Sequence, residues 1–410
     1  MDMKKSFGFI VGTAFMASCF FVNGAFLKAN ASAYVHSGIE NEAKVITVSN
    51  ESKTDLSLPV KAAYMMDSAS KTKIYAERET ERLPIASMCK IMTLVLCFDE
   101  INRGNLAMDQ SITVSDRAAS MGGSQVFLEA GGTYSVGELM KSIVVCSAND
   151  SCVALAEHIA GSEALFVGKM NEKAKELSAE NTLFANCTGL PKDPQYSCAK
   201  DVAYFLTELV KNEEYFAFSR IWTDRFMHPK GRYTDITNTN RMVRFYEGCD
   251  GGKTGFTNQA GFCLAATAKR GEMRIVSVVI GAETSDRRFG AVRTMFDYAF
   301  GNYALKTVLD ENNPLNEQVC VRNGKADFVQ VKAERGSYIF SKRDDAEEIS
   351  LDVRLKKSIK APVREGDDVG EAIVYKNSVE IDRVKLVAAE SVACAGFKER
   401  FKKVVGFWNV

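Results

Sequence analysis

The sequence predicts a two-domain chain of the α/β (α+β) class: an antiparallel sheet with a helical cluster, then a small all-β domain and a C-terminal amphipathic helix. Three observations predict it. Strand-like runs lie at both ends of the stretch 58–305 and enclose helical patterns, short strand-like runs follow in 316–390, and 410 residues exceed one ordinary domain. Strands from distant segments can pair in one sheet and gather the intervening helices around it.

The first domain, 58–305, begins with strand-like runs at 60–66 and 73–76, separated by turn residues. Helical patterns follow. Pro84 precedes an apolar stretch long enough for a core helix, and a capping-box pattern opens at Ser135. The predicted helices cover residues 85–101, 135–145, 150–160 and 162–177.

Strand character returns late in this domain and continues in the next. The runs 261–268 and 273–282 are rich in Val, Ile and Ala and are joined by a tight turn, which predicts a hairpin. Ser285 then caps an amphipathic helix. A polar linker is predicted at 306–315, and a small all-β domain at 316–390. Its strand-like runs are 319–321, 328–331, 338–340, 349–353 and 372–375.

The N-terminus has the composition of a targeting segment. Lys4 and Lys5 precede an apolar run and a small-residue site at 31–33, which predicts a signal peptide over 1–33 and an N-terminal arm over 34–57. An uncleaved anchor helix is the alternative, because the apolar run is about as long as a membrane span requires. The signal peptide predicts export, to the outer face of the cytoplasmic membrane or the cell wall.

The C-terminal segment, 391–410, has an apolar stripe at helical spacing on a basic background. A basic amphipathic helix that carries Phe and Trp and is too short to span a membrane is typical of a membrane interface. The alternative is a helix that docks on the protein's own β-domain. The stripe consists of Phe397, Phe401, Val404, Val405 and Trp408.

Composition excludes some classes of partner. Lys+Arg and Asp+Glu are equal at 52 each, so no global field favours nucleic acid, and we expect no nucleic-acid partner. The 11 cysteines are scattered through apparent helices and strands, where Cys behaves as a small buried hydrophobe. No C-x-x-C pair occurs and the three histidines are far apart, so we expect no zinc site, and no organic cofactor is implied either.

The first chemical motif is Ser87-Met88-Cys89-Lys90, at the start of the helix predicted after Pro84. A spacing of three places the hydroxyl and the amine on one helical face. Serine is a poor nucleophile until a base takes its proton, and a buried, neutral lysine is a suitable base. The alternative for this motif alone is a solvated surface lysine.

Two further motifs follow. Ser147-Ala148-Asn149 lies in the break between two predicted helices, where a hydroxyl can relay a proton and an amide can hold a peptide bond. Helix capping is the alternative. Lys253-Thr254-Gly255 lies on a predicted strand after two glycines, which permit close approach of a ligand to the backbone. A lysine with neighbouring hydroxyls suits a carboxylate, and the alternative is an ordinary edge-strand lysine.

In this order and spacing, the three motifs resemble the signature of the serine penicillin-recognising enzymes. The resemblance to low-molecular-weight D-alanyl-D-alanine carboxypeptidases is closer and covers roughly residues 55–303. It implies the penicillin-recognising transpeptidase-like fold for this domain. The matching runs are 119–125, 147–160, 188–190 and 250–255.

The resemblance implies a role for each motif residue. Ser87 attacks the carbonyl between two D-alanines and forms an acyl-enzyme, Lys90 takes the serine proton, and Ser147 passes a proton to the leaving amine. Asn149 holds the substrate backbone.

The strand motif supplies the remaining implied contacts. Lys253, Thr254 and Thr257 receive the terminal carboxylate, beside Gly255. The backbone N–H groups of Ser87 and Phe256 form the oxyanion hole. No histidine lies in a suitable motif, which counts against a Ser-His-Asp hydrolase.

The implied substrate is the pentapeptide stem of peptidoglycan, with β-lactams as inhibitors. A β-lactamase-like hydrolase of the same fold is one alternative, but its glutamate-activated water requires an acid that the sequence does not place, with Glu163 and Glu180 as the candidates. A catalytically idle sensor of peptidoglycan or β-lactams is another, against which the intact motifs argue. An endopeptidase that cuts crosslinks is a close variant.

Overall fold

The computed structural model describes residues 44–46, 55–345, 348–399 and 401. The predicted signal peptide, most of the N-terminal arm and the last residues of the tail lie outside this part of the chain.

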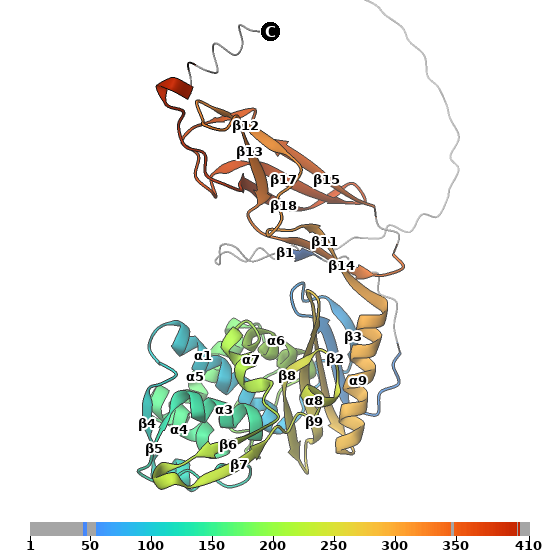
Figure 1. Ribbon diagram of the computed structural model, residues 1–410. Helices are drawn as coiled ribbons and strands as arrows, with labels where there is room; N and C mark the ends of the chain where they lie inside the picture. The colour runs from blue at the N-terminus through green and yellow to red at the C-terminus, as the bar shows by residue number, and fades with distance from the viewer. Residues whose placement is uncertain (1–43, 47–54, 346–347, 400, 402–410) are drawn as a thin grey trace, which may run out of the picture. The chain divides into compact units, whose positions relative to one another are not determined.

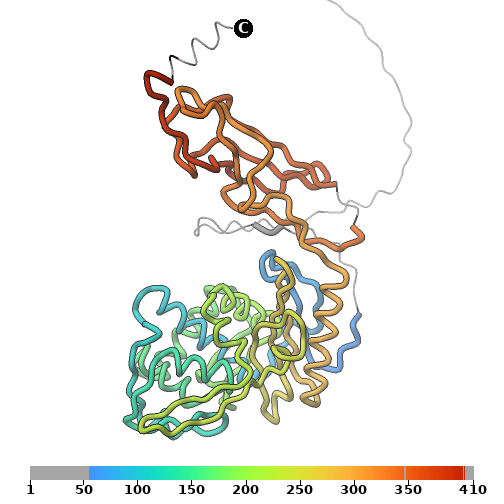
Figure 2. Tube along the Cα trace, viewed as in Figure 1, coloured from blue at the N-terminus to red at the C-terminus, as the bar shows by residue number. Residues whose placement is uncertain are grey.

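A five-stranded antiparallel sheet organises the first domain, as predicted (Figure 1). Strands from the two ends of the domain meet in it, because β2 pairs with β10 and places Tyr64 opposite Val278. In Figure 2 the blue trace of the early strands therefore runs beside the yellow trace of the late ones. The sheet order is β3 (Lys73–Glu77), β2 (Ala62–Asp67), β10 (Met273–Ala282), β9 (Gly261–Arg270) and β8 (Cys249–Thr257).

Both faces of this sheet are covered. Alternate residues of a strand point to opposite faces, so Tyr64 and Met66 join the core under the helical cluster, while Ala63 and Met65 join the core under α9 (Ser285–Asn302). This double burial explains why β2 is apolar almost throughout and shows no alternation.

The five predicted helices are present, with two differences at their starts, whereas four further helices of the described chain were not predicted. The first predicted helix is split into a 3-10 turn, η1 (Ala86–Cys89), and α1 (Lys90–Asn102). The cap of α9 is Thr284 and not Ser285. The other helices are α2 (Asp116–Ala119), α3 (Val136–Cys146), α4 (Asn149–Ala160), α5 (Glu163–Glu176), α6 (Ala199–Leu209), α7 (Glu213–Ser219) and α8 (Met242–Phe245).

Two small hairpins flank the helical cluster, and the sequence patterns did not predict them. Strand β4 (Ser111–Thr113) pairs with β5 (Thr133–Ser135). Strand β6 (Thr223–Met227) pairs with β7 (Tyr233–Thr237) around the short turn η2 (Pro229–Gly231). Each is too short or too polar to show a clear period of two.

The C-terminal part of the chain is all-β, as predicted, and contains two sheets. One is three-stranded, in the order β1-β14-β11, and the other is six-stranded, in the order β15-β17-β18-β13-β12-β16. The strands are β1 (Lys44–Ile46), β11 (Tyr303–Leu309), β12 (Gln318–Arg322), β13 (Phe328–Ala333), β14 (Ser337–Lys342), β15 (Ile349–Leu355), β16 (Ser358–Lys360), β17 (Asp368–Lys376) and β18 (Val379–Ala388).

Three boundaries differ from the predictions. Strand β1 lies inside the expected arm, and β11 takes in the first residues of the expected linker, 306–315. The tail helix starts at Phe397 and not at 391, because Val392 and Cys394 form bridges with Val363 and Gly324. Among the residues that the structure describes, no helix combines the length and apolarity needed to cross a bilayer.

Candidate active site

Ser87 lies in η1, directly before the first turn of α1, and Lys90 begins that helix. The Lys90 Nζ atom is 3.0 Å from the Ser87 Oγ atom and donates a hydrogen bond to the Thr188 backbone oxygen at 2.5 Å. The Lys90 side chain is fully buried. The predicted pairing of hydroxyl and amine is therefore confirmed, and the alternative of a solvated lysine is wrong.

Burial lowers the pKa of Lys90 below its ordinary value. In the described chain no ion pair joins this amine to a carboxylate, and its hydrogen bond to the Thr188 oxygen is a contact with a neutral group. Burial therefore shifts the balance toward the neutral amine. A neutral amine next to a hydroxyl can accept the proton that the hydroxyl must lose.

Glycines from two distant segments press against the chain next to Ser87. A Cβ on Gly189 would lie 2.0 Å from the Ala86 oxygen, and a Cβ on Gly255 would lie 2.7 Å from the Ile85 oxygen. Ala86 itself has a positive φ of 48°, an uncommon value for a residue with a side chain. Ala86 is the first residue of η1, so this conformation directly precedes Ser87.

Ser147 occupies the break between α3 and α4 in a left-handed conformation, with φ of 68°. It is buried, and its hydroxyl has no hydrogen-bond partner in the described structure. Strain of this kind together with an unsatisfied buried hydroxyl is typical of a functional position.

Asn149 directs its amide away from the helix. The N-cap of α4 is Ala148, which makes no side-chain cap bond, so the capping alternative for this motif is wrong. The Asn149 Nδ2 atom instead donates to the Gly122 oxygen at 2.7 Å. This bond fixes the orientation of the amide, whose second N–H and carbonyl oxygen are left for other partners.

Lys253 lies on β8, the edge strand of the main sheet. Its side chain is buried, and Nζ donates to the Thr254 backbone oxygen at 3.1 Å. Burial, and next the neighbouring charge of Lys90, lower the pKa of Lys253 well below its ordinary value. The predicted strand is confirmed, but the lysine is buried and not an ordinary solvated one.

Two of the three motifs meet at the serine, because a Cβ on Gly255 would come within 3.2 Å of the Ser87 nitrogen, so the strand of Lys253 runs directly past it. The motif of Ser147 is linked to this strand through Thr239, whose N–H donates to the backbone oxygen of Val145, two residues before Ser147. The Thr254 hydroxyl donates to Thr239 at 2.9 Å.

The end of β8 is open. The Phe256 side chain is 51% exposed, and its ring lies 4.3 Å from that of Phe262, measured between centroids. The Thr257 hydroxyl accepts a hydrogen bond from the Ala260 N–H at 3.0 Å.

Arg288 is a functional candidate that the sequence patterns did not single out. It projects from α9, is buried, and donates to the backbone oxygens of Gly255 and Cys263 at 3.2 and 3.3 Å. Its Nε has no partner among the described residues, and burial lowers its pKa to about 10. A buried guanidinium without a carboxylate, behind the lysine strand, adds positive potential there. An arginine on an amphipathic helix gives no such signal in sequence.

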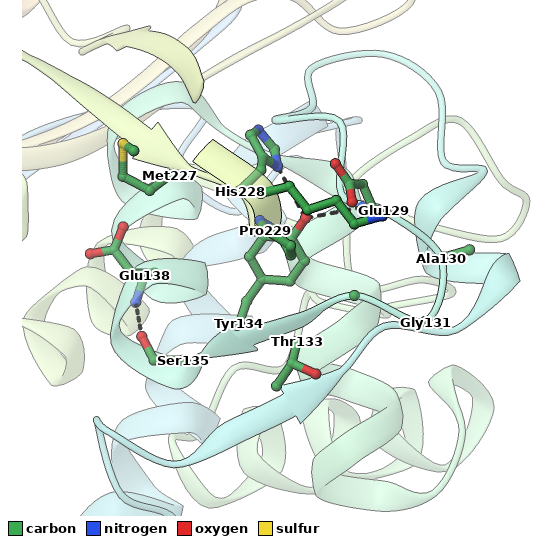
Figure 3. A pocket seen from close by; sticks show the side chains of 12 residues that line it. Glu129, Ala130, Gly131, Thr133, Tyr134, Ser135, Glu138, Met227, His228 and Pro229 are labelled. Atoms are coloured by element: carbon green, nitrogen blue, oxygen red, sulfur yellow. Dashed lines mark hydrogen bonds between the residues drawn. The ribbon is translucent and has the colours of Figure 1, made fainter. Parts of the chain in front are cut away.

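A cavity of about 670 Å³ lies apart from these residues. It lies between the segment 129–135 and the β6–β7 hairpin, and we call it the hairpin cavity (Figure 3). Its buried histidine, His228, contacts the Tyr134 hydroxyl at 3.0 Å and the Thr234 hydroxyl at 2.9 Å. Arg232 pairs with Glu129 at 3.1 Å. These groups satisfy one another and present no nucleophile.

Comparison with known proteins agrees with this geometry. Residues 47–284 match the family model of D-alanyl-D-alanine carboxypeptidases, and residues 303–393 match the model of the penicillin-binding protein 5 C-terminal domain. The chain is 37% identical to D-alanyl-D-alanine carboxypeptidase DacF of Bacillus subtilis, over 87% of this chain and 92% of that protein. It is 30% identical to DacC of Escherichia coli, over 83% of this chain and 86% of that protein.

Solved structures give the same result for the fold. Penicillin-binding protein 5 of Haemophilus influenzae superposes with a TM-score of 0.64 at 26% identity, over 83% of this chain and all of that one. PBP3 of Streptococcus pneumoniae superposes with a TM-score of 0.67 at 26% identity, over 82% of this chain and 99% of that one. The chain therefore belongs to the D-alanyl-D-alanine carboxypeptidase family of serine peptidases.

Proposed function

We propose that this serine carboxypeptidase removes the terminal D-alanine from peptidoglycan pentapeptide stems through an acyl-enzyme on Ser87. The observation that carries the proposal is the fully buried amine of Lys90, which lies 3.0 Å from the Ser87 hydroxyl and whose pKa is lowered by burial. β-Lactams are then inhibitors, because they acylate the same serine.

Acylation uses the residues around η1. The Ser87 Oγ attacks the carbonyl carbon between the two D-alanines, and its proton passes to Lys90 Nζ. The backbone N–H groups of Ser87 and Phe256 donate to the developing oxyanion. As the C–N bond breaks, a proton reaches the leaving amine through the Ser147 hydroxyl. Water then hydrolyses the ester and returns Ser87 to its free form.

Substrate binding uses the strand and the amide. Lys253, Thr254 and Thr257 receive the terminal carboxylate, with Arg288 behind them adding positive potential. A bound carboxylate favours the protonated form of Lys253 and so offsets the burial that lowers its pKa. Asn149 contacts the substrate backbone with the part of its amide that Gly122 does not use.

The acylation site is the direct test. The purified mature chain and Ser87→Ala are incubated with a fluorescent penicillin and with a peptide that ends in D-Ala-D-Ala. We expect a stable adduct on Ser87 and release of D-alanine, both absent from the variant. An adduct without D-alanine release would favour a sensor or an endopeptidase, and labelling of another residue would overturn the proposal.

The two glutamates considered for a β-lactamase mechanism have other positions. Glu163 pairs with Arg117 and accepts a hydrogen bond from the Cys187 N–H at 3.2 Å. Glu180 is exposed. Neither observation supports a glutamate that activates water for fast deacylation, which favours the carboxypeptidase.

We also propose that the enzyme is exported and that its tail helix rests on a membrane surface. In the described start of this helix, Phe397 and Phe401 are 85% and 61% exposed. Exposed aromatics on a basic helix favour an interfacial position over docking on the β-domain. In co-sedimentation with anionic lipid vesicles we expect the full chain to bind and a Phe397→Ser/Phe401→Ser variant to bind less. Equal binding of both would contradict the proposal.

A further inference from the structure

Asp150, the residue after Asn149, is a buried acid that the proposed chemistry does not use. No lysine or arginine contacts its carboxylate in the described chain, and its oxygens accept only backbone hydrogen bonds. The donors are the N–H groups of Val126 and Leu128, both at 3.1 Å, and of Ser151 at 3.0 Å. Burial raises its pKa, and these backbone hydrogen bonds act in the opposite direction.

The same loop is bound to Asn149 through its other half. The Asn149 N–H donates to the Ser124 oxygen at 2.7 Å, and its Nδ2 donates to the Gly122 oxygen at 2.7 Å. In residues 122–128, which we call the clamped segment, the first half accepts hydrogen bonds from Asn149 and the second half donates them to Asp150. Thr234 and Arg232 also donate to the Val126 and Phe127 oxygens. Asn149 and Asp150 together hold four of its backbone groups.

The fit at Asn149 leaves little room for movement. A Cβ on Gly123 would lie 2.8 Å from the Asn149 Nδ2 atom, and Gly123 has a φ of 80°, which favours glycine. The backbone therefore passes directly against the amide. If the second half of the clamped segment is released, the Gly122 oxygen loses its support and the amide loses the partner that orients it.

We propose that Asp150 is a positioning residue for Asn149. By fixing Val126 and Leu128, its carboxylate holds the clamped segment in the register that presents the Asn149 amide to the substrate. This inference rests on the proposed role of Asn149 in substrate binding.

The chain offers a matched control in Asp201. This residue is also a buried acid in the first turn of a helix, α6, and also holds a neighbouring loop. Its carboxylate accepts hydrogen bonds from the Asn181 N–H at 2.9 Å and the Thr182 hydroxyl at 2.8 Å. Its carboxylate contacts neither the clamped segment nor Asn149 in the described chain, so Asp201→Asn measures the general cost of losing a buried carboxylate.

The test is the rate of Ser87 acylation by a fluorescent penicillin in the full chain. We expect Asp150→Asn to slow acylation about tenfold to a hundredfold, because small displacements of a positioning group cost that much. In an Asn149→Ala background the same substitution should change the rate by less than about twofold, because the two residues act as one unit. Asp201→Asn should leave the rate within about twofold of wild type, although it lowers the melting temperature.

Equal slowing by Asp150→Asn in both backgrounds, or no slowing in the wild-type background, overturns the inference while the proposed function stands. Asn149→Ala acylated at the wild-type rate overturns both the role of Asn149 and this inference. If Asp150→Asn does not fold, Asp150→Glu keeps the charge and moves the oxygens by one methylene, and the same non-additivity is expected.

Discussion

The active site and the hairpin cavity differ in how completely their polar atoms are satisfied. In the active site, the Ser147 hydroxyl and the Arg288 Nε have no partner in the described structure. In the hairpin cavity, both ring nitrogens of His228 have partners, and the Tyr134 hydroxyl bridges His228 and the Glu129 N–H. The comparison shows that, among the described residues, the active site leaves buried polar atoms without partners, whereas the histidine and tyrosine of the hairpin cavity are paired.

The same contrast holds for charge. The cavity pairs its ions, with Arg232 on Glu129 at 3.1 Å and Lys141 on Glu138 at 2.9 Å. The active site buries the amines of Lys90 and Lys253 without a carboxylate next to either in the described chain. Burying amines without a neighbouring carboxylate lowers the stability of the folded protein. Such an arrangement fits a site that an anionic ligand completes.

The largest effect should come from removing the base. Lys90→Ala should slow Ser87 acylation about a thousandfold, because a positioned base contributes about 10²–10⁴. Stopped-flow labelling with fluorescent penicillin measures the rate, and Lys169→Ala, an exposed lysine of α5, is the control. Retained acylation in Lys90→Ala would remove Lys90 from the mechanism.

The carboxylate receptor comes next. Lys253→Ala should lower kcat/KM for a D-Ala-D-Ala peptide about tenfold to a hundredfold, since a hydrogen bond to a charged group contributes about 1.5–3 kcal/mol. The matched substrate is the same peptide with a C-terminal amide, on which the variant and wild type should differ much less. An equal loss on both substrates would contradict carboxylate binding by Lys253.

The buried amine of Lys90 should make both the acylation rate and the free energy of unfolding depend on pH. Only deprotonated Lys90 can act as base, so the acylation rate should rise with pH through its lowered pKa and fall about tenfold per pH unit below it. For stability, the unfolded chain binds this proton more tightly than the folded one. The free energy of unfolding should therefore rise with pH between the lowered pKa and the ordinary value of 10.5, and lose this contribution as pH falls.

Both profiles are measurable, by labelling rates and by urea unfolding at a series of pH values. Lys90→Met should lose the pH-dependent part of the unfolding free energy. A flat acylation profile, or an unfolding free energy whose pH dependence is unchanged in Lys90→Met, would refute the assignment.

The smallest effect is expected in the hairpin cavity. Tyr134→Phe removes the hydroxyl between His228 and Glu129 and should lower the free energy of unfolding by about 1–2 kcal/mol, because buried partners lose a hydrogen bond. The rate of Ser87 acylation should stay within about twofold of wild type. A large loss of acylation with little loss of stability would break the comparison and give the cavity a role in catalysis.

Sequence patterns predicted those helices and strands in which apolar residues recur at a regular spacing along the chain. The apolar helices and the β9–β10 hairpin are long enough to show it, whereas β6 and β7 are short and polar, and β1 has only three residues. The split of the first helix also escaped prediction, because nothing local reveals that Ala86 has a positive φ. That conformation depends on contacts with Gly189 and Gly255, which come from distant segments.

The site was predictable to a similar degree. The spacing of Ser87 and Lys90 determines their contact, since both lie on one turn of chain. The meeting of Lys253 with Ser87 depends on sheet pairing across the whole domain, so only the resemblance to a family pointed to it. Arg288 and Asp150 gave no signal, because a charged residue on a helix is normally a solvated one.

The two glycines beside the nucleophile also limit how this enzyme can evolve under antibiotic pressure. A side chain on Gly189 or Gly255 would push the carbonyls of Ala86 and Ile85 and so displace Ser87. In the proposed mechanism the Ser87 oxygen attacks both β-lactam and substrate, so this displacement affects both reactions alike. Substitutions of Gly189 or Gly255 that reduce acylation by β-lactams would therefore also reduce the enzyme's own reaction. Variants that discriminate between drug and substrate should arise in residues that contact only one of the two.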